Sequence, residues 1–175
     1  MGEHILQANW EPRLTLPQLP LKYLLELKIK ALLLDVDGTL LPGRELVLPD
    51  SVCCWIEDAR HHFELHLLSN NPSRNRIGEV ARQLQLSFTC GAAKPRRAAI
   101  RQVLENMNFM PSEIAIIGDR VFTDVLAGNR IGLYTVLVRP LRSDGYPSSH
   151  DRIQRIESQF AQWLGAKYRT SRINS

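Results

Sequence analysis

Two acidic segments of the chain have the residue types and the spacing that phosphoryl-transfer chemistry requires. Asp35 and Asp37 belong to the segment DVDGTL, and Asp119 and Asp124 belong to the segment GDRVFTD. Residues i and i+2 of an extended chain point the same way, so Asp35 and Asp37 can face one substrate. Asp35 is the expected nucleophile, which attacks phosphorus to form an aspartyl-phosphate. Asp37 is the expected acid and base, which protonates the leaving oxygen and later deprotonates water.

The other polar residues of these and two further segments are expected to bind a metal ion and the phosphoryl group. Four carboxylates in one crevice repel one another, and a divalent cation would offset that repulsion. Mg²⁺ suits an oxygen-only site, and its expected ligands are Asp35, Asp37 and Asp119, with Asp124 orienting the site. The segments LLSNN and AAKP supply the expected phosphate-binding residues, which are Ser69, Asn70 and Lys94.

Each of these residues also has a purely structural interpretation. An acidic pair after a strand can cap the next helix, and Ser69 or Asp124 can do the same. Lys94 can be a surface lysine ahead of Pro95. Arg120 can contact substrate phosphate or pair with a carboxylate, and the sequence does not decide between these roles. The catalytic interpretation is favoured because the residues follow separate predicted strands whose ends meet.

Short apolar runs alternate with helical periodicity along the chain, which predicts a parallel sheet covered by helices on both faces. The runs are too short for helices and are rich in Leu, Ile and Val, as buried strands are. They cover residues 31–36, 63–68, 113–118 and 134–138, with a further short strand around 87–89. The stretches between them carry apolar residues at helical spacing, so right-handed βαβ units follow. The carboxyl ends of such strands meet at one edge, where Asp35, Ser69 and Asp119 would gather.

Composition and length favour a single globular domain. The chain has 175 residues, of which 44% are hydrophobic and 23% are charged, and its net charge is +4. No window approaches the ~18–20 apolar residues of a membrane span, and the N-terminus lacks the pattern of a secretory signal. The cysteines form no CxxC pair and are expected to be reduced thiols, as in a cytoplasmic protein. They are Cys53, Cys54 and Cys90.

Changes in the pattern along the chain predict three parts. Prolines punctuate an N-terminal arm over residues 1–20, the catalytic domain covers 21–165, and a basic tail covers 166–175. The amphipathic stretch LKYLLELKIK either packs on the sheet edge or touches an anionic membrane surface. A final helix is expected to turn its apolar residues toward the core. These residues are Ile153, Ile156, Phe160, Trp163 and Leu164.

The ordered segments DVDGTL, LLSNN, AAKP and GDRVFTD resemble the four motifs of the haloacid-dehalogenase-like (HAD) phosphohydrolases. The stretches KPRRAAIRQVLENM, IGDRVFTDVLAGNRIGLYTVLVRP and SDGY extend the resemblance to the YqeG-type members of HAD subclass IIIA, over roughly residues 20–165. The resemblance implies a three-layer, Rossmann-like α/β core and a phosphatase related to those that act on phosphatidylglycerophosphate. Gly38 stands where YqeG-type members usually carry Asn, although D-x-D-G-T is common elsewhere in the superfamily.

The spacing between the motifs leaves no room for a large cap domain, so an open crevice is expected. Such a crevice accepts a phosphate displayed on a large group, and phosphatidylglycerophosphate is the leading expected substrate. Two alternatives stay open: a small soluble ester (sugar, nucleotide or histidinol phosphate), or a non-hydrolytic, receiver-like module that binds phosphate and Mg²⁺. We expect a cytoplasmic enzyme and leave open a peripheral membrane contact and a homo-oligomer. No nucleic-acid partner is expected, because basic residues are not interleaved with aromatic ones.

Overall fold

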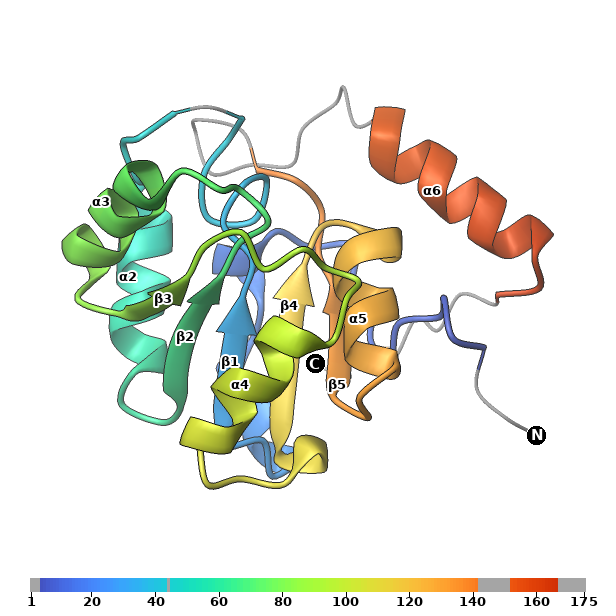
Figure 1. Ribbon diagram of the computed structural model, residues 1–175, viewed down its shortest axis with the longest axis horizontal. Coiled ribbons are helices and arrows are strands. Elements are labelled where there is room, and N and C mark those ends of the chain that lie inside the picture. The colour runs from blue at the N-terminus through green and yellow to red at the C-terminus, as the bar shows by residue number, and fades with distance from the viewer. Residues whose placement is uncertain (1–3, 44, 142–151, 167–175) are drawn as a thin grey trace.

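The centre of the molecule is a five-stranded parallel sheet (Figure 1), in a computed structural model that describes residues 4–43, 45–141 and 152–166. The strands are β1 (Ala31–Leu34), β2 (Glu64–Leu68), β3 (Ser87–Thr89), β4 (Ile114–Gly118) and β5 (Tyr134–Leu137). Their order across the sheet is β3-β2-β1-β4-β5, and every neighbouring pair is parallel. The four main apolar runs and the shorter run around residue 88 therefore form strands, as the sequence predicts.

Helices cover both faces of this sheet, because alternate strand residues point to opposite sides. In β1 all four side chains are fully buried: Leu32 and Leu34 join the larger apolar cluster, and Ala31 and Leu33 join a second one. The larger cluster includes residues of α2 (Asp50–Ala59) and α3 (Arg74–Leu84), and the second includes residues of α4 (Ala98–Asn106) and α5 (Leu126–Asn129). In Figure 1, α4 and α5 lie in front of the sheet. The fold is thus a three-layer α/β core.

The remaining elements are short or lie at the margins of the sheet. They are η1 (Leu16–Gln18), α1 (Leu21–Glu26), η2 (Pro111–Glu113), a single π-helical turn η3 (Val121–Val125) and α6 (Arg152–Trp163). The amphipathic stretch that forms α1 buries Leu24 in the larger cluster and leaves Lys22 exposed, so packing on the core is its observed role. None of the helices among the described residues has the length and apolar character to cross a bilayer.

The predicted N-terminal arm lies against the sheet. Trp10 is fully buried and forms a parallel bridge with Val136 of β5, and the Leu137 amide donates a hydrogen bond of 2.9 Å to the Trp10 carbonyl. Residues around Trp10 therefore extend the sheet by one short edge segment. The SDGY segment and, apart from Ala166, the predicted basic tail lie outside the described residues.

The orientation predicted for the last helix is wrong. The five apolar side chains expected to face the core are 44–78% exposed, whereas Glu157 and Ala161 of the same helix are buried. The physical reason is that α6 docks through polar groups. Gln154 donates to the backbone carbonyls of Asp119 and Val138, so hydrogen bonds at the end of the sheet decide which side of α6 faces inward.

Candidate active site

The carboxyl ends of the central strands bring the predicted site residues together. Asp35 directly follows β1, Ser69 follows β2 and Asp119 follows β4, while Asp124 lies in the η3 turn. The chain runs from β1 outward to β3 and then crosses back to β4 on the other side of β1. In an open parallel sheet, the carboxyl ends at such a switch in strand order form the usual ligand crevice.

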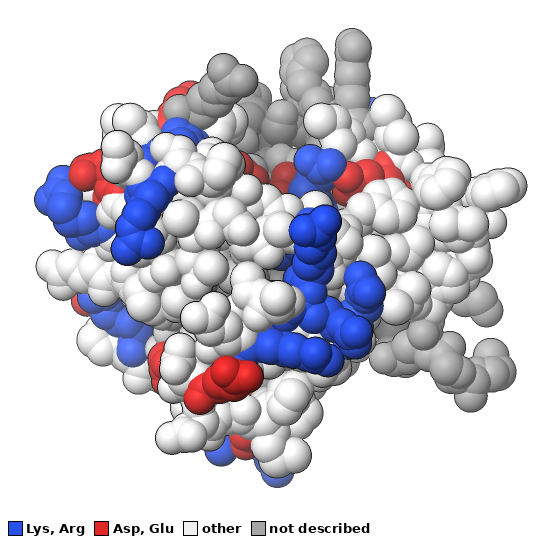
Figure 2. Space-filling model, in the orientation of Figure 1, with Lys and Arg blue, Asp and Glu red and all other residues white. Residues whose placement is uncertain are grey.

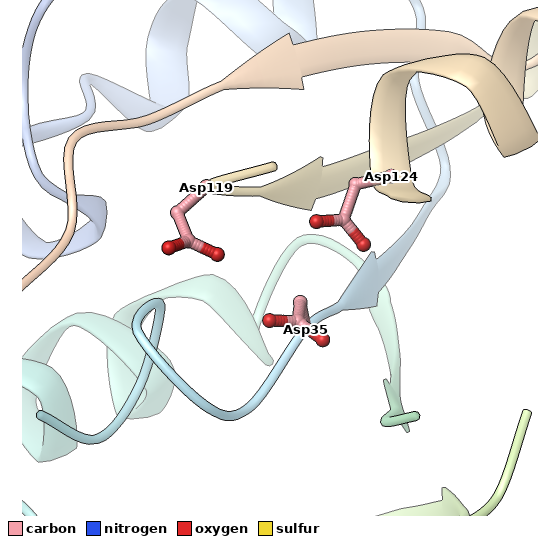
Figure 3. A group of neighbouring side chains, drawn as sticks. All are labelled: Asp35, Asp119 and Asp124. Atoms are coloured by element: carbon pink, nitrogen blue, oxygen red, sulfur yellow. The ribbon is translucent and has the colours of Figure 1, made fainter. Parts of the chain in front are cut away.

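Three carboxylates form a compact buried cluster at this place (Figure 3). Ligand oxygens of Asp35, Asp119 and Asp124 all lie within 4.8 Å of one another, and each residue is at most 8% exposed. The π-helical turn makes this possible, because the Arg120 carbonyl accepts hydrogen bonds from the amides of both Asp124 and Val125. That turn folds the Asp124 side chain back over the end of β4.

Two glycines allow the backbone to approach these carboxylates closely. Gly118 ends β4, and a Cβ atom there would lie 2.2 Å from Cγ of Asp124. Gly38 has φ +92°, and a Cβ atom there would lie 2.5 Å from Oδ2 of Asp119. Contacts this short are excluded for any other residue, so both glycines are steric requirements of the acidic cluster.

Lys94 is the only cation inside the cluster among the described residues. Its Nζ lies 2.7 Å from Oδ1 of Asp35 and 2.6 Å from Oδ1 of Asp124, and it donates to the Leu68 carbonyl at 2.8 Å. Burial would lower the pKa of Lys94, but the carboxylates of Asp124 and Asp35 outweigh that effect and raise the pKa. Lys94 is therefore a fixed positive charge beside Asp35, and its surface interpretation does not hold, because it is 4% exposed.

One ammonium does not balance three carboxylates, and burial together with this excess of negative charge raises the pKa of Asp35 and Asp119. Burial raises the pKa of Asp35 to about 7; Lys94 lowers it, and the charge of Asp124 raises it further. Burial and the charges of Asp35 and Asp124 raise the pKa of Asp119 well above its ordinary value. A cation would relieve both effects, since it stabilises the charged forms.

The donor set of this cluster fits a divalent cation. Oδ1 of Asp119 is buried and has no hydrogen-bond partner within the described residues, which is costly for a carboxylate unless another group binds it. Carboxylate oxygens alone are the ligands that Mg²⁺ prefers, and a few of them with retained waters suffice. Asp35, Asp119 and Asp124 are thus the residues whose side chains could hold the ion.

Asp37 lies outside this cluster of carboxylates. Its Oδ1 pairs with Nη2 of Arg76 at 2.6 Å, and its Oδ2 accepts from Nδ2 of Asn71 at 3.2 Å. The expected metal set joined Asp37 to Asp35 and Asp119 and gave Asp124 an orienting role. In the structure the Asp124 side chain is in the cluster and the Asp37 side chain is beside it.

The two expected phosphate-binding residues after β2 differ in their contacts. Ser69 is buried, and its Oγ accepts a hydrogen bond of 3.1 Å from the Asn71 amide, which leaves its hydroxyl proton for another acceptor. Asn70 uses its side chain on the backbone of Lys94: Nδ2 donates to the carbonyl at 2.9 Å, and Oδ1 accepts from the amide at 2.6 Å. The Asn70 side chain therefore positions the segment that carries Lys94.

Two residues that no sequence pattern indicated support the site from outside its motifs. Arg76 of α3 holds Asp37 and also donates to the carbonyls of Gly43 and Glu45. Glu157 of α6 pairs with Arg120, accepting from its Nε at 2.8 Å, and also accepts from the Val121 amide. In this structure Arg120 thus pairs with a carboxylate, which is one of the two roles considered for it. An arginine or a glutamate on a helix carries no spacing signal that would have revealed these contacts.

The four ordered motifs meet at one edge of the parallel sheet. They place acids after β1 and β4, a hydroxyl after β2 and a buried lysine beside them, which is the arrangement of a HAD-like phosphohydrolase. Comparison with known proteins agrees. The model of the HAD-hydrolase-like family matches residues 91–141, which include Lys94 and Asp119. A solved structure of a HAD superfamily, subfamily III A, hydrolase from Legionella pneumophila superposes with a TM-score of 0.52, over 81% of this chain and 89% of that one, at 19% identity.

Curated relatives narrow the class further. The chain is 32% identical to the probable phosphatase YqeG of Bacillus subtilis, over 73% of this chain and 74% of that protein. It is 27% identical to the mitochondrial phosphatidylglycerophosphatase GEP4 of Saccharomyces cerevisiae, over 78% and 79% of the two chains. The chain belongs to the YqeG-type family of HAD-like phosphatases.

Proposed function

We propose that the protein is a Mg²⁺-dependent phosphomonoesterase that works through an aspartyl-phosphate on Asp35, and that its substrate is phosphatidylglycerophosphate or another phosphate displayed at a membrane. The observation that carries the proposal is the placement of the Asp35 carboxylate, 2.7 Å from the Lys94 ammonium and within 4.8 Å of Asp119 and Asp124. A nucleophile held between a cation and metal-binding acids is arranged to approach an anionic phosphoryl group.

The first half of the reaction uses residues at the ends of β1 and β2. A carboxylate oxygen of Asp35 attacks phosphorus in line, the bond from phosphorus to the leaving oxygen breaks, and Asp37 gives that oxygen a proton. Lys94 and the Ser69 hydroxyl donate hydrogen bonds to the non-bridging oxygens of the phosphoryl group. A bound Mg²⁺, held by Asp35, Asp119 and Asp124, would supply positive charge that neutralises the phosphoryl oxygens.

The second half regenerates the enzyme. Asp37, now a carboxylate, takes a proton from water, the water oxygen attacks phosphorus, and the bond from phosphorus to Asp35 breaks to release inorganic phosphate. Arg76 pairs with the carboxyl group of Asp37 in the structure. Donation of the first proton therefore requires that Asp37 turn from Arg76 toward the leaving oxygen.

The lack of an inserted cap domain among the described residues supports a large substrate. Among the described residues, no helix or strand is inserted between β1 and α2, and α3 leads directly into β3. Nothing in this part of the chain resembles a domain that would enclose a small ester. The named activity of the yeast relative makes phosphatidylglycerophosphate the first substrate to test.

The test compares the purified wild type with Asp35→Asn on a soluble aryl phosphate and on phosphatidylglycerophosphate in mixed micelles, with Mg²⁺ and with a chelator. We expect wild-type turnover that depends on Mg²⁺ and that is at least about tenfold more efficient on the lipid. The turnover of Asp35→Asn should be at least ~10³-fold lower than that of the wild type, because an amide is not a nucleophile. Acid quenching should trap phosphate on Asp35 of the wild type.

The control is Asp58→Asn, which changes an exposed aspartate of α2 in the same way and should leave turnover at the wild-type level. Wild-type turnover by Asp35→Asn would overturn the proposal. A trapped phosphate that persists without turnover would instead favour the receiver-like module, and preference for soluble esters would reassign the substrate.

A further inference from the structure

Helix α6 exposes an apolar stripe to solvent. We define the α6 stripe as Ile153, Ile156, Phe160 and Trp163 of the helix, with Leu164 directly after it. Ile156 is 64% exposed and Trp163 is 78% exposed, which is unusual for large apolar side chains that recur on one side of a helix. The ring of Phe160 stacks on Trp163 at 5.7 Å and lies 6.0 Å from the ring of Phe122. Since Phe122 belongs to η3, the stripe continues to the turn that carries Asp124.

Polar contacts hold the α6 stripe in its exposed position. Gln154 donates to the carbonyls of Asp119 (2.6 Å) and Val138 (2.7 Å), and Glu157 pairs with Arg120 and accepts from the Val121 amide. Turning the stripe inward would break these bonds and leave their buried partners without hydrogen bonds. The α6 stripe is therefore a fixed feature at the rim of the active site.

A cluster of arginines lies on the same face of the molecule. We define the basic cluster as Arg96, Arg97, Arg101 and Arg130, all of them exposed. Within the described ranges none of the four takes part in an ion pair, and Arg130 donates to the Pro95 carbonyl beside Lys94. Figure 2 shows basic side chains gathered over the start of α4 and the end of α5, with the largely uncharged surface of α6 on the same side.

We propose that the α6 stripe and the basic cluster together dock the protein on a bilayer that contains anionic lipid, with the acidic site facing the headgroups. Apolar and aromatic side chains of such a helix enter the acyl boundary, and arginines beside it are attracted to the anionic surface. A second copy of the chain fits this surface less well than a bilayer does, because two copies in contact through it would bring their basic clusters together. The inference deepens the proposed function and rests on it for the nature of the substrate.

The experiment measures flotation of the full chain with vesicles, which requires no turnover. The probes are vesicles of phosphatidylcholine with phosphatidylglycerol and vesicles of phosphatidylcholine alone. We expect the wild type to float with the anionic vesicles and to be released by salt. Ile156→Gln/Trp163→Gln should lower the partition coefficient about tenfold or more, since two large apolar groups no longer enter the bilayer. Arg97→Gln/Arg101→Gln should lower it about fivefold per charge, on anionic vesicles only.

Matched controls separate docking from folding and from catalysis. Met110→Gln removes another apolar side chain, 66% exposed but remote from the α6 stripe in the fold, and should float like the wild type. Asp35→Asn should also float with the anionic vesicles. Flotation therefore tests the docking surface even if the proposed catalytic mechanism is wrong. The proposal is overturned if the wild type ignores anionic vesicles or if the α6 variant floats equally well. It is also overturned if the wild type sediments as a dimer and the α6 variant sediments as a monomer, because the stripe would then contact a second copy of the chain.

Discussion

The lack of a Cβ atom at Gly38 is a steric requirement of the active site. A Cβ atom at this position would lie 2.5 Å from Oδ2 of Asp119, and the backbone has φ +92°. Gly38→Ala should therefore push Asp119 out of the acidic cluster and weaken the binding of a divalent cation. We expect kcat/KM to fall at least ~100-fold, because a displacement of about 1 Å is enough for a loss of that size. Steady-state kinetics and a Mg²⁺ titration measure the two effects.

Gly43→Ala is the matched control for this substitution. Gly43 also has a positive φ, +54°, but a Cβ atom there would meet nothing within 4 Å. The variant should lose about 1 kcal/mol of stability from backbone strain and keep kcat/KM within about twofold of the wild type. Equal losses of activity in the two variants would show that the close approach to Asp119 does not matter.

His66, which lies outside the acidic cluster, is expected to make the stability of the fold depend on pH. The ring lies in β2 and contacts the hydroxyls of Ser87 (Nδ1, 2.7 Å) and Thr89 (Nε2, 2.9 Å) in β3. Burial lowers the pKa of His66 to about 4. Between the ordinary value near 6.5 and this value, the unfolded chain binds a proton that the folded chain does not, so stability falls as pH falls through that window.

We expect His66 to contribute a loss on the order of 2–3 kcal/mol between pH 7 and pH 4. Urea unfolding of the wild type and of His66→Gln isolates this contribution, because the variant keeps every other titrating group. The curve of the variant should be flatter by that amount over the acid range. His61→Gln, which changes an exposed histidine, should reproduce the wild-type curve, and a flattened curve for His61→Gln would contradict the assignment to His66.

At the scale of elements, Arg76 of α3 connects the helix to the loop after β1. Its guanidinium pairs with Asp37 at 2.6 Å and donates to the carbonyls of Glu45 (2.8 Å) and Gly43 (3.1 Å). Arg76→Gln should loosen that loop and misplace Asp37. We expect kcat to fall roughly tenfold with little change in KM, because Asp37 acts in proton transfer and not in ground-state binding.

Limited proteolysis gives a second readout of the Arg76 contacts, since a freed loop over residues 41–49 should be cut faster than in the wild type. The matched control is Arg82→Gln, in the same helix, where the arginine pairs with Glu79 on the surface. This control should leave both readouts unchanged. Unaltered kcat and cleavage in Arg76→Gln would show that Asp37 keeps its position without Arg76.

The elements differ in how much of them the sequence reveals. The central strands are predicted to within one or two residues, because strands buried on both faces are almost uniformly apolar, as Leu32 and Ile116 illustrate. The motif residues Asp35 and Asp119 meet as expected, because parallel strands bring their carboxyl ends to one edge of the sheet. Lys94 also reaches Asp35 as expected, but through a segment that the Asn70 side chain holds in place. The inward face of α6 was not predictable, since periodicity locates an apolar stripe but not the hydrogen bonds of Gln154 that decide where it points.

At the scale of the whole molecule, the N-terminal segment has no periodic signal and yet belongs to the core. Trp10 is fully buried in the larger apolar cluster, and the centre of its ring lies 4.3 Å from that of Tyr23. Backbone hydrogen bonds with β5 and with the residues just after it hold the segment, including the bond of 2.8 Å from the Arg139 amide to the Leu14 carbonyl. We infer that the folding unit begins before residue 21, where the sequence pattern places the start of the domain.

Trp10→Ala tests that inference directly. Removal of a fully buried tryptophan leaves a cavity and should cost about 3–5 kcal/mol of unfolding free energy, a large part of the stability of a domain of this size. Trp163→Ala is the matched control, because that side chain is 78% exposed and its loss should change stability by no more than about 0.5 kcal/mol. Urea unfolding followed by circular dichroism compares the two. If Trp10→Ala cost as little as Trp163→Ala, the segment would be an appendage of the domain and not part of its core.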